Sequence, residues 1–227
     1  MKKIALILTL LIVLTSCKKA DAAATEICDG CLTFYFQNPQ PDNDSELTSF
    51  PAKFKGLYMN SDSIFIRIEE DRILKEYFIK FKVHKLKMDS LRSEYDLVGG
   101  KLITKDTKDK FDVKVVSDSI ELSRKIIDTL FRFSLNQKAK RINGQLVLST
   151  RDSVFWNIQT IALEKNILKI KHIYLKEDLK KLDSVTVIKG RMLDSTSYLI
   201  KPTRREFKDI LKIKNLGTDL QYDKVLK

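Results

Sequence analysis

The chain has 227 residues, of which 43% are hydrophobic and 32% are charged, and its formal net charge is +12 at pH 7. The positive charge suits anionic lipid headgroups, an acidic polymer or an acidic partner. It does not indicate nucleic acid, because the lysines are scattered between apolar residues rather than clustered with arginines and aromatic residues.

The first residues have the order of a secretory signal. Two lysines precede an apolar run at residues 4–14, which is too short to cross a bilayer as a helix. The run leads to Leu-Thr-Ser-Cys, ending at Cys17, which resembles the bacterial lipobox, and the Ser-Cys-Lys-Lys context resembles lipoproteins of the Bacteroidota. The resemblance implies that residues 1–16 are removed and that Cys17 carries a diacylglycerol. The alternative is an ordinary secretory signal with a chance cysteine.

The residues after Cys17 bear on the location. Surface-exported lipoproteins of that group usually carry acidic residues there, whereas this chain has Lys18 and Lys19, so the resemblance implies the periplasmic face of the outer membrane. Without residues 1–16 the chain keeps 40 basic and 30 acidic residues, a net charge near +10. We expect no cofactor apart from the covalent lipid on Cys17. The expected partners are outer-membrane lipid, through this anchor, and an unknown envelope protein or ligand.

Residues 17–52 are expected to form a lipidated tether and an irregular segment. Residues 18–26 lack an apolar period, and residues 37–51 hold three of the four prolines. Between them, Cys28 and Cys31 form a CxxC motif, for which a disulfide is the expectation in an oxidising compartment. A redox site would need a helix after the motif, although Leu-Thr-Phe-Tyr-Phe indicates a strand, and a metal site would need two further ligands.

A lipidated cysteine followed closely by CxxC and a β domain also resembles the NlpE family, envelope lipoproteins of copper tolerance and stress sensing. That family usually carries a tryptophan-glycine element before its CxxC, which is absent here. The resemblance supports a second hypothesis, a metal- or redox-responsive envelope sensor that uses Cys28 and Cys31.

Residues 53–227 are expected to form a single, mainly antiparallel β domain. Its strands would form either an antiparallel, barrel-like sheet or a sandwich. Apolar side chains share the odd positions of residues 73–83, as a half-buried strand requires. Seven Asp-Ser pairs punctuate the chain, and such pairs mark turns because their side chains bond to nearby amides. Apolar, β-prone residues follow those at Asp62, Asp118, Asp152 and Asp183.

Residues 54–100 and 142–191 read as two diverged repeats. Each has a glycine, an Asp-Ser pair, an apolar strand, a second strand that alternates with lysine and ends near His84 or His172, another Asp-Ser pair and a glycine. Shared strand composition in a lysine-rich protein is the alternative. A short C-terminal helix is also predicted, with Thr203 as N-cap, Glu206 as its capping-box partner and Gly217 beyond the end.

The candidate chemistry is sparse. His84 and His172 occupy corresponding repeat positions and could meet as metal ligands, although such histidines more often cap a strand or face water. Trp156 is expected in the core or at its rim, with stacking on a ligand as the alternative. No nucleophile, zinc-protease or nucleotide motif is present, so no catalytic residue is assigned. The leading hypothesis is a non-enzymatic envelope lipoprotein that binds a partner or ligand in the periplasm; a hydrolase with an unrecognised carboxylate site is a third.

Overall fold

The computed structural model describes residues 31–87 and 93–225, and Leu32–Lys227 form one compact unit. The expectation of a mainly β protein with a short helix is confirmed. The sheet is mixed, because β1 and β14 run parallel while the other pairs are antiparallel. It does not close into a barrel.

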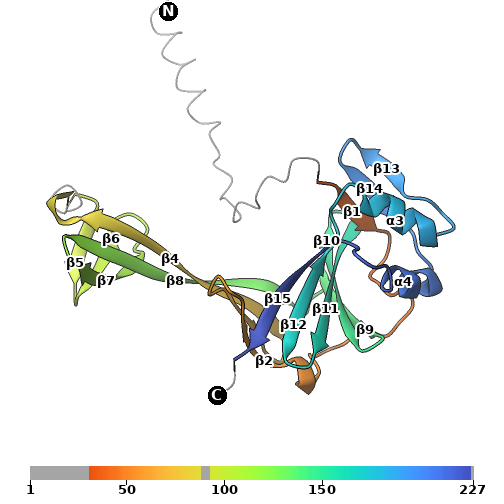
Figure 1. Cartoon of the computed structure of the whole chain (residues 1–227), viewed down its shortest axis with the longest axis horizontal. Helices are drawn as coiled ribbons and strands as arrows, with labels where there is room; N and C mark the ends of the chain where they lie inside the picture. The colour runs from red at the N-terminus through yellow and green to blue at the C-terminus, as the bar shows by residue number, and fades with distance from the viewer. Residues whose placement is uncertain (1–30, 88–92, 226–227) are drawn as a thin grey trace, which may run out of the picture. The chain divides into compact units, whose positions relative to one another are not determined.

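The elements follow one another as in Figure 1. The strands are β1 (Thr33–Phe36), β2 (Gly56–Met59), β3 (Phe65–Ile68), β4 (Arg72–His84), β5 (Tyr95–Val98), β6 (Lys101–Thr104), β7 (Lys110–Val116), β8 (Ser119–Arg132), β9 (Gln137–Ile142), β10 (Gln145–Asp152), β11 (Phe155–Glu164), β12 (Ile167–His172), β13 (Arg191–Asp194), β14 (Ser197–Ile200) and β15 (Thr218–Lys224). The helices are the 3-10 turns η1 (Ala52–Phe54) and η2 (Lys85–Lys87), and α3 (Asp178–Val185) and α4 (Arg204–Ile210).

The sheet branches at β11. One edge of β11 pairs with β10, which continues to β9. The other edge pairs first with β1, at Trp156 and Asn157, and then with β12 from Gln159 onward. From β12 the sheet continues through β15, β2, β3, β4, β8, β7 and β6 to β5, whereas from β1 it continues through β14 to β13.

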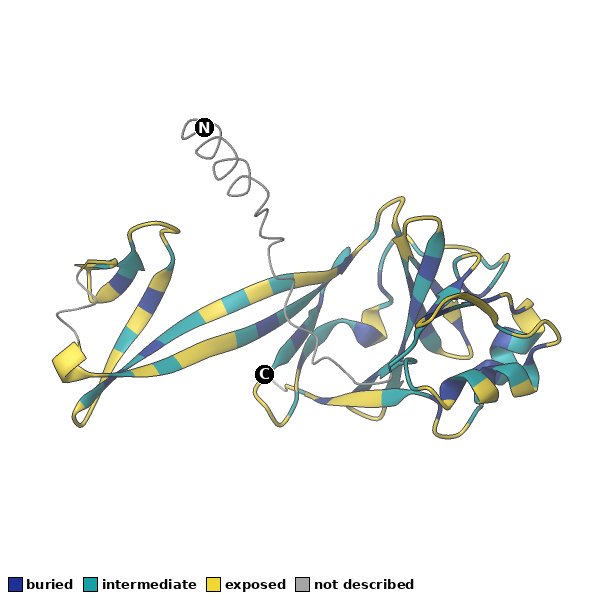
Figure 2. Cartoon of the chain, turned by 90° about the horizontal axis from the view of Figure 1, so that it is seen from above, coloured by how far each residue is buried: buried dark blue, intermediate teal, exposed yellow. Residues whose placement is uncertain are grey.

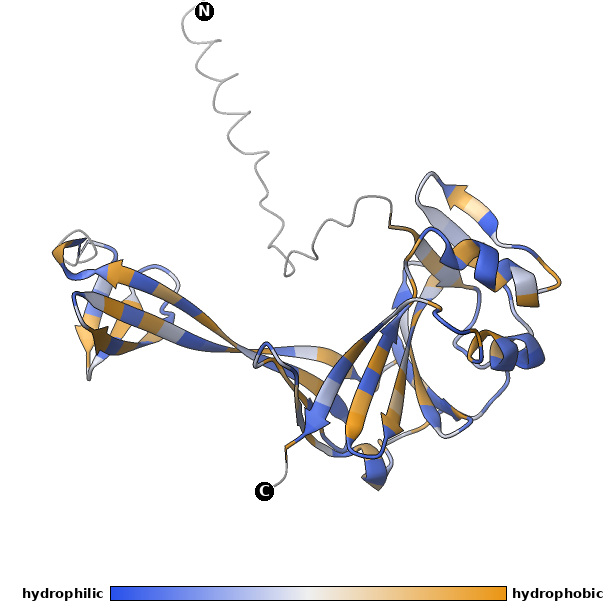
Figure 3. Cartoon of the chain, viewed as in Figure 1, coloured by the Kyte–Doolittle hydropathy of each residue, from blue (hydrophilic) through white to orange (hydrophobic). Residues whose placement is uncertain are grey.

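The strands from β9 to β4 curve around the main core (Figure 1). We call the side of these strands that faces this core the concave face. Side chains alternate across each strand, so directly paired residues share a face. Ile161 pairs with Ile170, and Leu168 pairs with Tyr222, and all four are buried on the concave face. Figure 3 shows the resulting alternation of apolar and polar positions along these strands.

A second core lies where the short branch of the sheet meets both helices. It contains Trp156, Phe36 from β1, Leu182 from α3, and Phe207 and Ile210 from α4. The predicted capping box is confirmed: Thr203 accepts from the Glu206 backbone amide, and the Glu206 carboxylate accepts from the Thr203 amide at 2.7 Å. A helix therefore starts where the sequence predicted.

Two details of this region differ from the sequence analysis. Helix α4 is not the last element, because β15 follows it and pairs with β12 and β2. The expected strand after Asp183 is wrong, since Asp183 lies within α3, where Leu179 and Leu182 place apolar side chains on one face. A helical spacing of apolar residues prevailed there over the β-prone residues that follow.

The long strands β4 and β8 leave the main core together. Strand β3 pairs with β4 only up to Glu76, and β7 pairs with β8 only at residues 119–123. Between these points residues 76–79 of β4 pair with residues 124–127 of β8, and from residue 77 to residue 79 no third strand joins them. We call this two-stranded segment the ribbon. Beyond it, β5, β6 and β7 cover a third, small core formed by Leu102, Phe111, Ile120 and Leu122.

The proposed repeats share part of their topology. Strands β2, β3 and β4 form a three-stranded antiparallel meander, and so do β10, β11 and β12. The following elements differ, since η2 and β5 follow the first meander and α3 follows the second. The duplication stays a prediction. The compact unit begins well before residue 53, because β1 lies inside the sheet. Among the described residues, no helix has the length and apolarity to cross a membrane.

Candidate functional site

Three polar side chains from β4, β11 and β12 lie close together on the concave face. Lys75 of β4 pairs with the buried Ile66, Gln159 of β11 pairs with the buried Leu148, and His172 of β12 pairs in turn with Gln159. Paired residues share a face, so all three point into the concavity of the sheet. Burying a polar group costs free energy unless the group has a hydrogen-bond partner. These three side chains are therefore candidates for binding a ligand.

Burial and the contact with Gln159 favour the neutral form of His172. Burial lowers the pKa of its imidazole below the ordinary value, because the charged form loses hydration. The Gln159 side-chain nitrogen lies 3.3 Å from Nδ1 of His172. An amide nitrogen donates, so Nδ1 accepts and the ring proton is on Nε2. His172 therefore offers a hydrogen-bond donor through Nε2.

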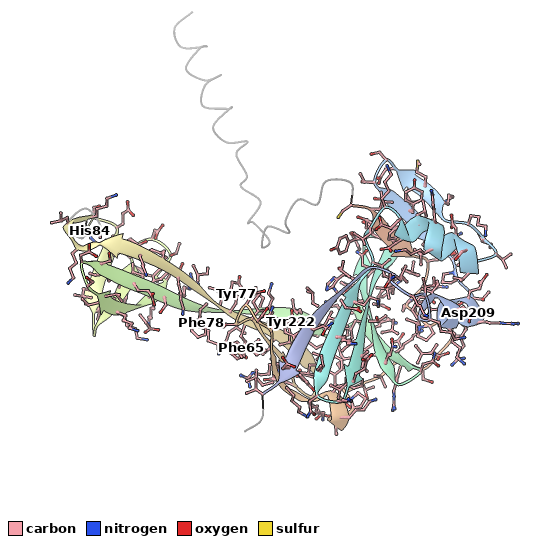
Figure 4. All side chains as sticks on the ribbon, in the orientation of Figure 1. Phe65, Tyr77, Phe78, His84, Asp209 and Tyr222 are labelled. Carbon is pink, nitrogen blue, oxygen red and sulfur yellow. The ribbon has the colours of Figure 1, made fainter. Side chains whose placement is uncertain are left out.

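These three residues line one pocket. Its volume is about 160 Å³, which is small beside the roughly 300–1,000 Å³ of sites for drug-sized ligands. Leu130 and Leu220 at its rim are 42% and 47% exposed. The full lining comprises Ile66, Ile73, Lys75, Leu130, Leu148, Gln159, Ile161, Ile170, His172, Leu220 and Tyr222. Figure 4 shows Tyr222 close to the root of the ribbon.

A larger depression, about 470 Å³, is lined by Gly56, Leu57, Arg67, Ile68, Glu69, Lys224 and Val225. Two of its charged side chains are already in ion pairs, since Arg67 pairs with Glu76 at 2.5 Å and Glu69 pairs with Arg72 at 3.3 Å, and Lys224 Nζ lies 5.9 Å from the centroid of the Tyr58 ring. This arrangement gives it no convergent set of free polar groups, so we assign no ligand to it.

The ribbon exposes large apolar side chains on both of its faces. Phe78 and Ile127 are 47% and 55% exposed on one face, and Ile79 is 44% exposed on the other. Figure 2 shows that exposed and intermediate positions dominate this stretch of β4 and β8, and Figure 4 places Tyr77 and Phe78 along it. Large apolar side chains that lie exposed side by side are typical of interaction sites and are uncommon on the surface of a monomer.

Cations accompany Phe78 and Ile127 on their face. Lys80 and Lys82 alternate with Phe78 along β4, and Lys114 of β7 shares the face through its pairing with Glu121. All three lysines are exposed, and within the described chain none forms an ion pair. We call Phe78, Ile127, Lys80, Lys82 and Lys114 the ribbon patch.

A buried carboxylate fixes the root of the ribbon patch. Glu76 is only 4% exposed, and it accepts from Arg67 Nε at 2.5 Å and from Lys125 Nζ at 2.5 Å. The hydrogen bond from Arg67, assisted by the one from Lys125, holds the pKa of Glu76 below its usual value. The two cations are thereby occupied by ion pairs within the chain.

The structure separates the two histidines of the proposed repeats. His84 lies at the far end of β4 (Figure 4), where its Nδ1 accepts from the Leu86 amide at 3.2 Å and its Nε2 lies 3.4 Å from an Asp118 carboxylate oxygen. His172 lies in the main core. The alternative in which these two side chains meet as metal ligands is therefore wrong, because β4 carries His84 out along the ribbon, where it caps the end of the strand. Among the described residues, no group of three or more His, Cys, Asp or Glu side chains could hold a metal ion.

Trp156 is buried at 7% exposure in the second core, as expected for a core or rim residue. Lys138 and Arg151 lie about 6 Å from its ring centroid, so its outer face is already covered by cations. Cys17 and Cys28 lie outside the described residues, and Cys31 is the first described residue. The lipidation and the disulfide therefore stay predictions.

Sequence reasoning missed Lys75, Gln159 and the ribbon patch. The signal for the ribbon was present: Phe78 interrupts the odd-position alternation of residues 73–83, so both faces of that strand carry apolar residues. No such local signal exists for Lys75 and Gln159, since each is one polar letter among many. Comparison with protein-family models, curated proteins and solved structures gives no match.

Proposed function

We propose that this chain is a lipid-anchored protein of the bacterial outer membrane, without catalytic activity, that binds an acidic envelope protein through the ribbon patch. The observation that carries the proposal is the exposure of Phe78 and Ile127 beside three lysines without ion pairs. Apolar anchors ringed by like charges suit a partner surface with an apolar centre and flanking carboxylates.

The mechanics of the ribbon support a binding role. An isolated pair of strands is marginally stable in water, since it has no covered face. Here the ribbon is held at both ends, by the main core at Glu76 and by the small core around Leu122. A surface fixed in this way loses little conformational entropy when a partner covers it, so more of the contact energy appears as affinity.

The open strand edges favour a protein over a membrane surface as the partner. Within the described residues, no strand pairs with the outer edge of β4 beyond Glu76 or with the outer edge of β8 at residues 124–131. Such edges present unpaired backbone N–H and C=O groups, which a strand of another protein satisfies. Lipid headgroups offer no matching row of donors and acceptors.

The proposed anchor sets where this surface works. Fourteen residues separate Cys17 from Leu32, where the compact unit begins. A chain of that length spans at most about 50 Å. A lipid on Cys17 would therefore confine the unit to a layer close to the membrane, and binding there gains from the raised local concentration of other membrane-attached proteins.

In-cell photocrosslinking tests the proposal. A benzophenone amino acid replaces Phe78 in one variant and Lys180, an exposed residue of α3, in a control variant. We expect one discrete protein adduct from position 78 only, and mass spectrometry should identify an acidic envelope protein. Charge reversal by Lys80→Glu with Lys82→Glu should reduce that adduct at least tenfold, whereas Lys176→Glu with Lys180→Glu should not.

Three results would overturn the proposal. Adducts of equal pattern from positions 78 and 180 would mean that the ribbon patch has no specific partner. Adducts with lipid alone would mean that the patch rests on the membrane. An adduct that survives the Lys80 and Lys82 reversal would remove the electrostatic part of the argument.

A further inference from the structure

We infer that the pocket on the concave face binds a small amphipathic carboxylate, with its apolar tail among the core side chains and its carboxylate at Lys75 and Nε2 of His172. This site is separate from the ribbon patch: it lies on the concave side of β4, whereas Phe78 and Lys80 lie on the opposite side of the same strand.

The walls of the pocket define the tail. Seven of its eleven lining residues are Ile or Leu, so an aliphatic chain loses water on entry and gains close contacts. An apolar cavity of roughly 150 Å³ in another protein holds a benzene molecule, and the present volume of about 160 Å³ is similar. The ligand is therefore of about six to ten heavy atoms.

Lys75 supplies the positive charge. Within the described chain it forms no ion pair, and its recorded contact is with the Tyr77 ring, whose centroid lies 5.4 Å from Nζ. Asp128 is its cross-strand neighbour, and that carboxylate accepts a hydrogen bond from the Tyr77 hydroxyl; burial first, and then the charge of Asp128, raise the pKa of Tyr77. An ammonium group beside apolar walls that makes no ion pair with the neighbouring acid favours an anionic group from outside the chain.

The remaining polar groups fit the same ligand. The Gln159 side-chain nitrogen donates to Nδ1 of His172, and the Nε2–H of the neutral ring, which lines the pocket, is the donor that remains. The neutral imidazole neither repels Lys75 nor requires a second negative charge. Lys75 and His172 thus provide one charged and one neutral donor, which matches the two oxygens of a single carboxylate better than a phosphate dianion.

The exposed rim gives such a ligand a way in. Leu130 and Leu220, both about half exposed, border the pocket on the side of the ribbon root. Leu130 is the extra residue at the register shift where Ile73 pairs with Phe131 and Leu74 pairs with Thr129. A bulge of this kind turns a side chain out of the regular ladder, so the entrance is a built feature of the β4 and β8 pairing.

Hexanoate is the probe that tests the inference, and hexan-1-ol is its neutral counterpart. Burying the shared five-carbon tail corresponds to a dissociation constant of about 1 mM for the neutral probe, and the carboxylate contacts should lower that of hexanoate to about 0.1 mM. Chemical-shift titration of the whole mature protein by NMR should show saturable shifts at His172 and at Leu and Ile methyl groups of the pocket. Hexanol should bind at least tenfold more weakly, because it lacks the carboxylate.

Two variants separate binding from folding. Lys75→Met keeps the length and apolar stem of the side chain but removes its charge, and should weaken hexanoate at least tenfold while leaving hexanol unchanged. Leu220→Trp, at a half-exposed rim position, should block both probes without unfolding the protein. Lys180→Met, on exposed α3, is the matched control and should bind like the wild type.

The inference is overturned if hexanoate and hexanol bind equally, if Lys75→Met binds hexanoate as the wild type does, or if no pocket methyl shifts at 20-fold the expected dissociation constant. A folded Leu220→Trp variant with unchanged hexanoate affinity would place the ligand elsewhere, and would equally reject this site.

Discussion

The close approach of Gly217 to strand β12 gives a stability prediction that the structure makes quantitative. Gly217 has φ +62°, and a Cβ atom there would lie 2.0 Å from the His172 carbonyl oxygen and 2.9 Å from its carbonyl carbon. Those atoms belong to the backbone of a paired strand, so they cannot move aside alone. The Gly217 amide also donates to the buried Asp178 carboxylate at 3.0 Å.

Gly217→Ala should therefore destabilise the protein through two effects. The left-handed backbone conformation costs an alanine about 1 kcal/mol, and the forced displacement at the start of β15 adds about 2 kcal/mol, as overpacking typically does. Gly144→Ala is the matched control. Gly144 also has a positive φ, +79°, but the nearest atom to its Cβ would be the flexible Lys53 Nζ at 3.9 Å, so only the first cost applies.

Urea unfolding followed by the fluorescence of Trp156, the single tryptophan, measures both variants. We expect a loss of about 3 kcal/mol for Gly217→Ala and about 1 kcal/mol for Gly144→Ala. Equal losses for the two variants would refute the reasoning, because they would show that the backbone approach between Gly217 and His172 does not exist in the folded protein.

Three further predictions follow from the charged root of the ribbon and from the cysteines. Glu76→Gln should be less stable than the wild type at pH 7, and the difference should shrink as the pH falls below about 4.5. The reason is that the folded state lowers the pKa of Glu76. The carboxylate therefore stabilises the folded protein above its unfolded-state pKa, and this stabilisation is lost as the carboxylate becomes protonated. Urea midpoints between pH 7 and pH 3 measure this, and a pH-independent difference would contradict it. Cys17→Ala should abolish incorporation of a fatty-acid analogue in metabolic labelling, because only a thiol at that position can become the lipid thioether; a labelled mutant would rule out the lipobox. Cys28→Ser with Cys31→Ser should lose at most about 2 kcal/mol if the pair is a structural disulfide in a very short loop, and cells carrying it should tolerate copper, zinc and thiol oxidants like the wild type; a selective loss of metal tolerance would favour the sensor hypothesis instead.

The sequence alone determined the local features that depend on neighbouring residues. The alternation along residues 73–83 predicted a strand, and β4 covers it. Thr203 and Glu206 predicted the start of α4, because a capping box is satisfied within four residues. The strand after Cys31 was likewise visible in Leu-Thr-Phe-Tyr-Phe and is β1.

Only the tertiary structure decided which strands became neighbours, and the candidate sites depend on those neighbours. Lys75, Gln159 and His172 share a pocket because β4, β11 and β12 surround one core, although more than 80 residues separate Lys75 from Gln159. The ribbon exists because β4 and β8 are far longer than β3 and β7 and pair beyond them. The same extension carries His84 away from His172. Register between distant strands is set by the burial of whole faces together, which no local run of residues encodes.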